Sequence, residues 1–161
     1  MMRILQIKMI CGGTPPEERT LDLSGSGVLS SGAFGSGAAL LEALCLALYG
    51  RGVPRPVGTP SPLDGEEGEK EECEVEAVFE AGDEGGRPVR YRAACTLSRG
   101  GEGVVPARRT LRRIEEGTKE RDASGPIEEV TGLSFEAFLR SALLRRDAFS
   151  ALLRTEPETR A

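Results

Sequence analysis

The stretch GAFGSGAALLEALCLALYG, residues 32–50, joins a glycine-rich loop directly to a run of helix-forming residues. Residues 38–49 are rich in alanine and leucine and contain no proline, and Gly50 stands where a helix typically ends. Because this run is apolar on nearly every side, we expect its helix to be buried between other elements. A glycine loop that opens into a helix of this kind raises the question of a phosphate-binding loop.

Gly32 and Gly37 have the spacing of the two glycines in the phosphate-loop motif G-x-x-x-x-G-K-[ST]. Glycines suit this chemistry because backbone N–H groups must approach phosphate oxygens with no Cβ between them, and the helix N-terminus adds a positive dipole end. The rest of the motif is absent, since Ala38 occupies the place of the lysine and Ala39 that of the hydroxyl residue. The candidate nucleotide-binding residues of the loop are Gly32, Gly35, Ser36, Gly37, Ala38 and Ala39.

The two alanines predict weak binding of ATP and negligible hydrolysis. A charge-assisted hydrogen bond contributes about 1.5–3 kcal/mol, so its loss lowers the affinity for ATP roughly tenfold or more. Groups that stabilise transition-state charge are worth on the order of 10²–10³ in rate, and here two are missing. On this pattern alone, a plain glycine-rich connection without a ligand is the alternative.

Strand and helix patterns around the loop predict one α/β domain with a mixed sheet. Alternation of apolar and polar residues indicates strands at residues 3–10, 20–23, 73–79, 88–97 and 110–114, with a weak candidate at 28–29. The turn-rich AGDEGG, residues 81–86, predicts an antiparallel β-hairpin. Two helices follow: one over Ile127–Thr131 with Pro126 in its first turn, and a longer one with Ser134 as N-cap. The apolar face of the longer helix consists of Phe135, Phe138, Leu139 and Ala142.

These elements divide the chain into four segments. Residues 1–50 hold the first strands, the glycine loop and the first helix, and residues 51–72 form a proline-rich and acidic linker. Residues 73–121 form the hairpin region, and residues 124–161 form the helical segment. We expect all four to belong to one domain of 161 residues.

The composition excludes several kinds of chemistry. The chain has no histidine, which excludes Ser-His and Cys-His nucleophile pairs and most zinc sites. Four cysteines stand singly, so we expect reduced thiols and neither a disulfide framework nor a metal cluster. No run approaches the roughly 18 apolar residues of a membrane span, and the N-terminus lacks an export signal. We therefore expect a cytoplasmic chain without a membrane partner.

The net charge of −5 conceals two segments of opposite sign. Residues 64–84 are strongly acidic, whereas residues 87–121 are rich in arginine. One interpretation is a hairpin whose strands pair acid against base. The other is a patch that binds the DNA backbone, formed by Arg108, Arg109, Arg112 and Arg113.

Several segments together resemble one family, the SbcC-type ATPase, which is the SMC-like subunit of the bacterial SbcCD nuclease. LLEALCLALYG (Leu40–Gly50) looks like the first helix of that ATPase, and DLSG (Asp22–Gly25) is similar to the segment before its third strand. EECEVEAVFEAGDEGGRPVRYRA (Glu71–Ala93) resembles its antiparallel hairpin. LSFEAFLRSALLRRDAFSALLRTEPETRA (Leu133–Ala161) is similar to its helix and Q-loop. The likeness covers only the N-terminal lobe of a P-loop ATPase head of the ABC/SMC type.

The resemblance implies ATP and Mg²⁺ as ligands and a role in DNA double-strand-break repair. It implies a C-terminal ATPase lobe or second head and an SbcD-type nuclease subunit as partners. The chain departs from the family at chemical positions: besides Ala38 and Ala39, Arg146 aligns with the Q-loop glutamine, and CGGT (Cys11–Thr14) replaces an aromatic-containing turn. We therefore expect no hydrolysis by this chain alone. The alternatives are a degenerate interaction module or gene remnant without nucleotide binding, and an unrelated α+β domain.

Overall fold

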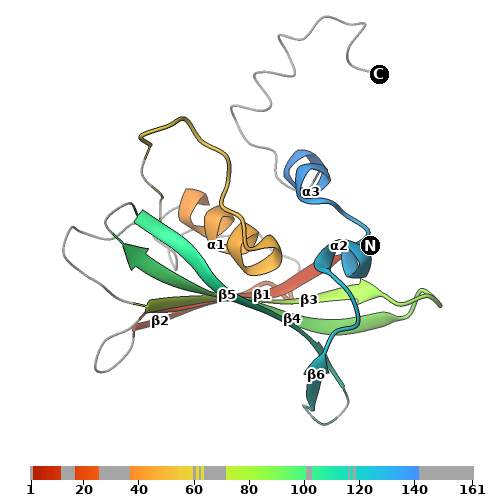
Figure 1. The fold of residues 1–161 in the computed structure, drawn as a ribbon. Coiled ribbons are helices and arrows are strands. Elements are labelled where there is room, and N and C mark those ends of the chain that lie inside the picture. The colour runs from red at the N-terminus through yellow and green to blue at the C-terminus, as the bar shows by residue number, and fades with distance from the viewer. Residues whose placement is uncertain are drawn as a thin grey trace, which may run out of the picture.

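The computed structural model describes residues 2–11, 17–25, 37–59, 61, 63, 72–100, 103–115, 117 and 119–141. Six strands in these ranges form one sheet in the order β2-β1-β3-β4-β5-β6, and every neighbouring pair is antiparallel. The strands are β1 (Arg3–Cys11), β2 (Glu17–Asp22), β3 (Glu72–Gly82), β4 (Pro88–Gly100), β5 (Gly103–Ile114) and β6 (Glu120–Asp122). The helices are α1 (Gly37–Tyr49), α2 (Ile127–Thr131) and α3 (Phe135–Ser141), and all three lie on the same side of the sheet (Figure 1).

The sheet has one face in the core and one open face, and the alternation along β3 shows this most clearly. Cys73, Val75, Ala77, Phe79 and Ala81 are buried toward the helices, whereas the glutamates between them point the other way. Successive side chains of a strand point to opposite faces, so the apolar–polar alternation in the sequence assigns each residue to a face. We call the side away from the helices the open face.

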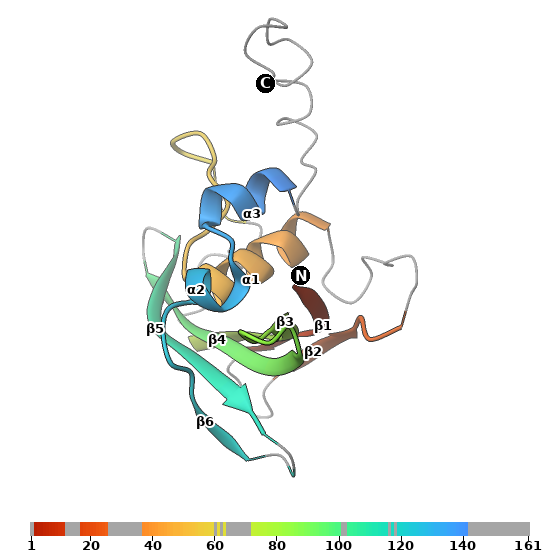
Figure 2. The same cartoon turned by 90° about the vertical axis from the view of Figure 1, so that its right-hand side faces the viewer.

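Helix α1 lies between the sheet and α3 (Figure 2). Its buried residues come from every side of the helix, as the uniformly apolar sequence predicts. Tyr49 joins α1 to α3, because its ring lies 5.4 Å from that of Phe135 and 5.3 Å from that of Phe138. Its hydroxyl donates a hydrogen bond to the carbonyl of Leu133 at 3.0 Å. The expectation of a helix buried between other elements is confirmed.

The chain after α1 packs back onto the helix through a buried carboxylate. Glu42 of α1 is only 3% exposed and forms an ion pair with Arg55. The backbone N–H of Val53 donates to Glu42 Oε2 at 2.9 Å. A Cβ added to Gly52 would lie 2.5 Å from Glu42 Oε1, so the backbone approaches the carboxylate at a position that leaves no space for a side chain. The start of the expected linker is thus packed against α1.

The α/β class predicted from the sequence is confirmed, whereas the expected mixed sheet is antiparallel throughout the described strands. The hairpin of β3 and β4 is present, and Ser134 caps α3 by accepting the N–H of Ala137 at 3.2 Å. Pro126 is the N-cap of α2 rather than part of its first turn. Strand β5 begins well before Thr110, and β6 was not predicted. The weak strand at 28–29 and the chain after residue 141 lie outside the described residues.

Candidate functional site

Of the candidate loop residues, the structure describes Gly37, Ala38 and Ala39. Gly37 is the first residue of α1 in the described part of the chain. Ala38 is exposed in the first turn, and Ala39 is 4% exposed. The first turn contains no acidic residue that would repel an anion. Gly32, Gly35, Ser36 and Arg146 lie outside the described residues.

The start of α1 does not fit a magnesium ion through its side chains. Mg²⁺ requires oxygen ligands in near-octahedral geometry, usually from carboxylates, hydroxyls and phosphates. Ala38 and Ala39 offer only methyl groups, and the methyl group of Ala39 is buried in the core. Any phosphate at this helix end would depend on backbone N–H groups alone.

The four arginines proposed to contact DNA do not share one surface. In the β4–β5 register, Arg109 and Arg113 stand opposite Cys95 and Tyr91, which are both buried on the helix side of the sheet. Arg108 and Arg112 are on the open face, since they line a hollow there with Thr110. Neighbouring residues of a strand point to opposite faces, so the RR pairs of the sequence are divided. A continuous basic patch made of all four side chains is not formed.

The acidic and basic segments instead meet across the β3–β4 hairpin, as the first interpretation predicted. Glu80 of β3 accepts a hydrogen bond from Arg90 Nε of β4 at 3.1 Å. Glu76 lies 3.6 Å from Arg92 Nε in the same hairpin. Cross-strand pairs of opposite charge favour this pairing by roughly 0.2–1 kcal/mol each. Part of the charge segregation therefore stabilises the sheet.

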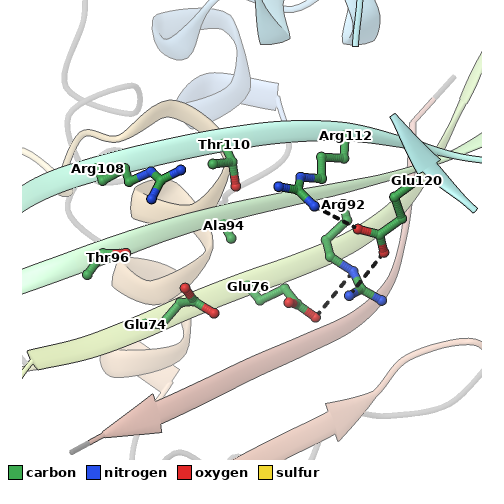
Figure 3. Close-up of a pocket in the computed structure, with 9 residues that line it drawn as sticks. All are labelled: Glu74, Glu76, Arg92, Ala94, Thr96, Arg108, Thr110, Arg112 and Glu120. Carbon is green, nitrogen blue, oxygen red and sulfur yellow. Dashed lines mark ion pairs between the residues drawn. The ribbon is translucent and has the colours of Figure 1, made fainter. Parts of the chain in front are cut away.

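A polar hollow of about 260 Å³ lies on the open face over β3, β4, β5 and β6. Figure 3 views it from the side opposite the helices, with long charged side chains surrounding short ones. The lining residues are Glu74, Glu76, Arg92, Ala94, Thr96, Arg108, Thr110, Arg112 and Glu120. Three carboxylates and three guanidiniums line it together with two hydroxyls, so its walls are mostly polar.

One end of this hollow is an ion-pair network centred on Glu120. The carboxylate lies 3.1 Å from Arg92 Nη1 and 3.7 Å from Arg112 Nη1, so it joins β4 and β5 to β6 (Figure 3). Arg92 also reaches Glu76 on β3. Burial raises the pKa of Glu76, and the nearby Arg92 and Lys8 oppose this shift only in part. The network holds the positions of the side chains at this end of the hollow.

The sequence alone does not predict the residues that line the hollow, because they come together only through the pairing of the strands. Ala94 and Thr96 have short side chains on the open face of β4, and their shortness creates the space. Alternation assigns them to the open face, but only the strand order places Glu74 and Arg108 on either side of Thr96. No sequence spacing connects residues so far apart in the chain.

Among the described residues, no group of three or more cysteine and carboxylate side chains is placed to hold a metal ion. No helix in the described ranges is long and apolar enough to cross a membrane. None of the four cysteines forms a disulfide.

No protein-family model matches the chain, and a search of curated proteins finds no significant similarity.

Proposed function

We propose that this chain is an SbcC-like ATPase-domain protein of DNA double-strand-break repair that does not hydrolyse ATP on its own. The observation that carries the proposal is the start of α1 at Gly37, directly after a loop with phosphate-loop glycine spacing. The antiparallel hairpin of β3 and β4 and the capped helix α3 agree with the order of elements that the resemblance implies. In this proposal the family scaffold is kept and its catalytic side chains are lost.

The proposed role is therefore one of binding rather than turnover. Backbone N–H groups of the loop and the dipole of α1 would hold a phosphate weakly, without help from Ala38 or Ala39. Hydrolysis would require a second lobe or head that supplies the missing groups, and the nuclease partner would be of the SbcD type. A cytoplasmic location and contact with DNA belong to the same proposal. Because the four arginines are split between two faces, DNA contact would use at most part of this set.

Titration of the full chain with a fluorescent ATP analogue tests this proposal. We expect weak binding by the native chain and an affinity at least about tenfold higher for the double variant A38K/A39S, because it restores the charged partner of the phosphates. Ala39 is buried, so the variant A38K alone provides the same test without adding a buried hydroxyl. The matched control is A107K, which adds the same charge at an exposed position of β5.

Two outcomes would contradict the proposal. If neither A38K nor the double variant binds more tightly than A107K while both remain folded, the loop does not have phosphate-loop geometry. If the native chain also fails to bind at millimolar ATP, both alone and with a candidate C-terminal lobe, the alternative is favoured. That alternative is a degenerate interaction module without nucleotide binding, and the burial of the Ala39 methyl group agrees with it.

A further inference from the structure

The hollow on the open face has walls of opposite charge facing each other across a floor of small residues. In the strand register, Glu74, Thr96 and Arg108 form one row across β3, β4 and β5. Glu76, Ala94 and Thr110 form the next row. The β3 wall is thus acidic, and the β5 wall carries a guanidinium and a hydroxyl (Figure 3). An electric dipole directed across the strands is built into this site.

The ion pairs of the hollow leave two opposite charges available. Arg92 and Arg112 are both engaged by Glu120, and Glu76 is engaged by Arg92. Within the described part of the chain, the structure shows no ion pair for Glu74 or Arg108. Neighbouring strands lie about 4.8 Å apart, so the backbones of these two residues are separated by roughly 10 Å with Thr96 between them. A molecule lying over Thr96 would meet the carboxylate at one end and the guanidinium at the other.

We propose that this hollow binds a small zwitterion, a free α-amino acid or a dipeptide, with its ammonium group at Glu74 and its carboxylate at Arg108. The guanidinium of Arg108 can donate two parallel hydrogen bonds to a carboxylate, and the hydroxyl of Thr110 lies on the same wall. The volume of about 260 Å³ is below the roughly 300–1,000 Å³ typical of sites for drug-sized ligands, so it suits a smaller molecule.

The chemistry of the walls argues against other occupants. A nucleic-acid strand would bring its phosphates against Glu74 and Glu76, and no aromatic side chain among the described residues lines the hollow to stack a base. A simple cation would meet three guanidiniums, and an apolar molecule would desolvate charged groups without replacing their hydrogen bonds. A zwitterion matches both walls at once. This site is on the face opposite α1, so it is independent of any nucleotide at the glycine loop.

Amide NMR shifts of the full chain, titrated with matched probes, test the proposal. The zwitterions are L-alanine and glycylglycine, which separate an amino acid from a dipeptide; N-acetylglycine carries only the negative group and glycinamide only the positive one. We expect saturable shifts at Thr96 and Thr110 with one or both zwitterions. Each singly charged probe should bind about tenfold more weakly or worse, because one charge-assisted contact is lost.

Two pairs of variants complete the test. R108Q should weaken zwitterion binding about tenfold, whereas R109Q, one residue away on the other face, should leave it unchanged. E74Q should weaken it similarly, whereas E72Q, an exposed residue of β3 outside the hollow, should not. All four positions are solvent-accessible, and unchanged amide shifts in α1 will show that each variant is folded. Equal affinity for the singly charged probes, no saturation with either zwitterion, or equal effects of R108Q and R109Q would overturn the proposal.

Discussion

Replacing the buried glutamate of α1 tests whether the segment after the helix is held in place by a single carboxylate. In the variant E42A, Arg55 loses its ion pair with Glu42, the N–H of Val53 loses its acceptor, and the hydroxyl of Ser61 loses a 3.5 Å hydrogen bond. The carboxylate is 3% exposed, so water cannot replace it without reorganising the packing. We therefore expect E42A to destabilise the whole domain and not only the loop.

The magnitude follows mainly from the lost ion pair with Arg55 and the lost acceptor of the Val53 N–H. A buried donor without an acceptor costs about 1–3 kcal/mol. Breaking a fully buried ion pair costs about 3–5 kcal/mol. The side chain of Arg55 is 23% exposed and can turn partly to water, so the loss should fall below that range. We expect E42A to lower the free energy of unfolding by about 2–3 kcal/mol.

Urea denaturation followed by circular dichroism measures this loss. With a typical slope of about 2 kcal/mol per molar urea, the midpoint should fall by roughly 1–1.5 M. The matched control is E17A, which removes the carboxylate of the exposed Glu17–Arg19 pair, where the side chains are 64% and 40% exposed. Exposed pairs contribute about 0–1 kcal/mol, so E17A should change stability little. If E42A costs no more than E17A, the carboxylate does not hold the segment.

Three further predictions concern single residues or residue pairs. Gly50 has φ of +63°, and an added Cβ would lie 3.2 Å from a β5 arginine side chain; G50A should cost about 1–2 kcal/mol in urea denaturation. In G58A, the replaced glycine has φ of +83° but an added Cβ meets open space, so this variant should lose less stability.

Cys11 and Cys73 are paired in register across β1 and β3. The Cα atoms of such a pair are roughly 4.5–5.5 Å apart, which is within the range of a disulfide. The thiol oxidant diamide should therefore link the two cysteines, and the variant C73S should abolish the link. A cross-linked peptide that joins Cys11 to a cysteine other than Cys73, identified by mass spectrometry, would contradict that register.

The last of the three is a pH dependence. Burial raises the pKa of Glu76 above its usual 4.5, so folding favours its protonated form. That contribution is fully present below the unfolded pKa and is lost as pH rises through the folded pKa. The stability of the native chain minus that of E76Q should therefore fall as pH increases from about 4.5 upward. A difference that rises with pH in urea titrations would refute the assignment.

Local patterns predicted the elements that depend on local interactions. The hairpin of β3 and β4 follows from alternation on both sides of a glycine-rich turn, in which Gly86 has φ of +73°. Helix α1 follows from its composition and from Gly50 at its end. Strand β6 is not predicted from the sequence, because its three residues show no apolar–polar alternation and are held by pairing with β5. The first part of β5 is not predicted either, because Pro106 argues against a strand. In the structure this proline is accommodated next to a shift in the β4–β5 register.

Less of the candidate site than of the fold could be predicted from the sequence. Reading charge along the chain grouped Arg108 with Arg109, although alternation in β5 separates them onto two faces. The carboxylate most involved in the hollow, Glu120, lies on a strand that was not predicted. Which charges face each other is decided by the strand order, and that order depends on contacts between residues distant in sequence.

The sheet separates the two proposed sites, and this separation makes them independently testable. Helix α1, which begins at Gly37, lies on one side of the sheet, whereas Thr96 and Arg108 border the hollow on the other. Since α1 rests on the buried face of β3 and β4, a variant at Ala38 should leave zwitterion binding unchanged, and R108Q should leave ATP binding unchanged. Coupling between them would require a change in the sheet itself, because α1 packs against β3 and β4, and these strands also line the hollow. A measured coupling would therefore point to movement of β4, whose alternate residues face α1 on one side and the hollow on the other.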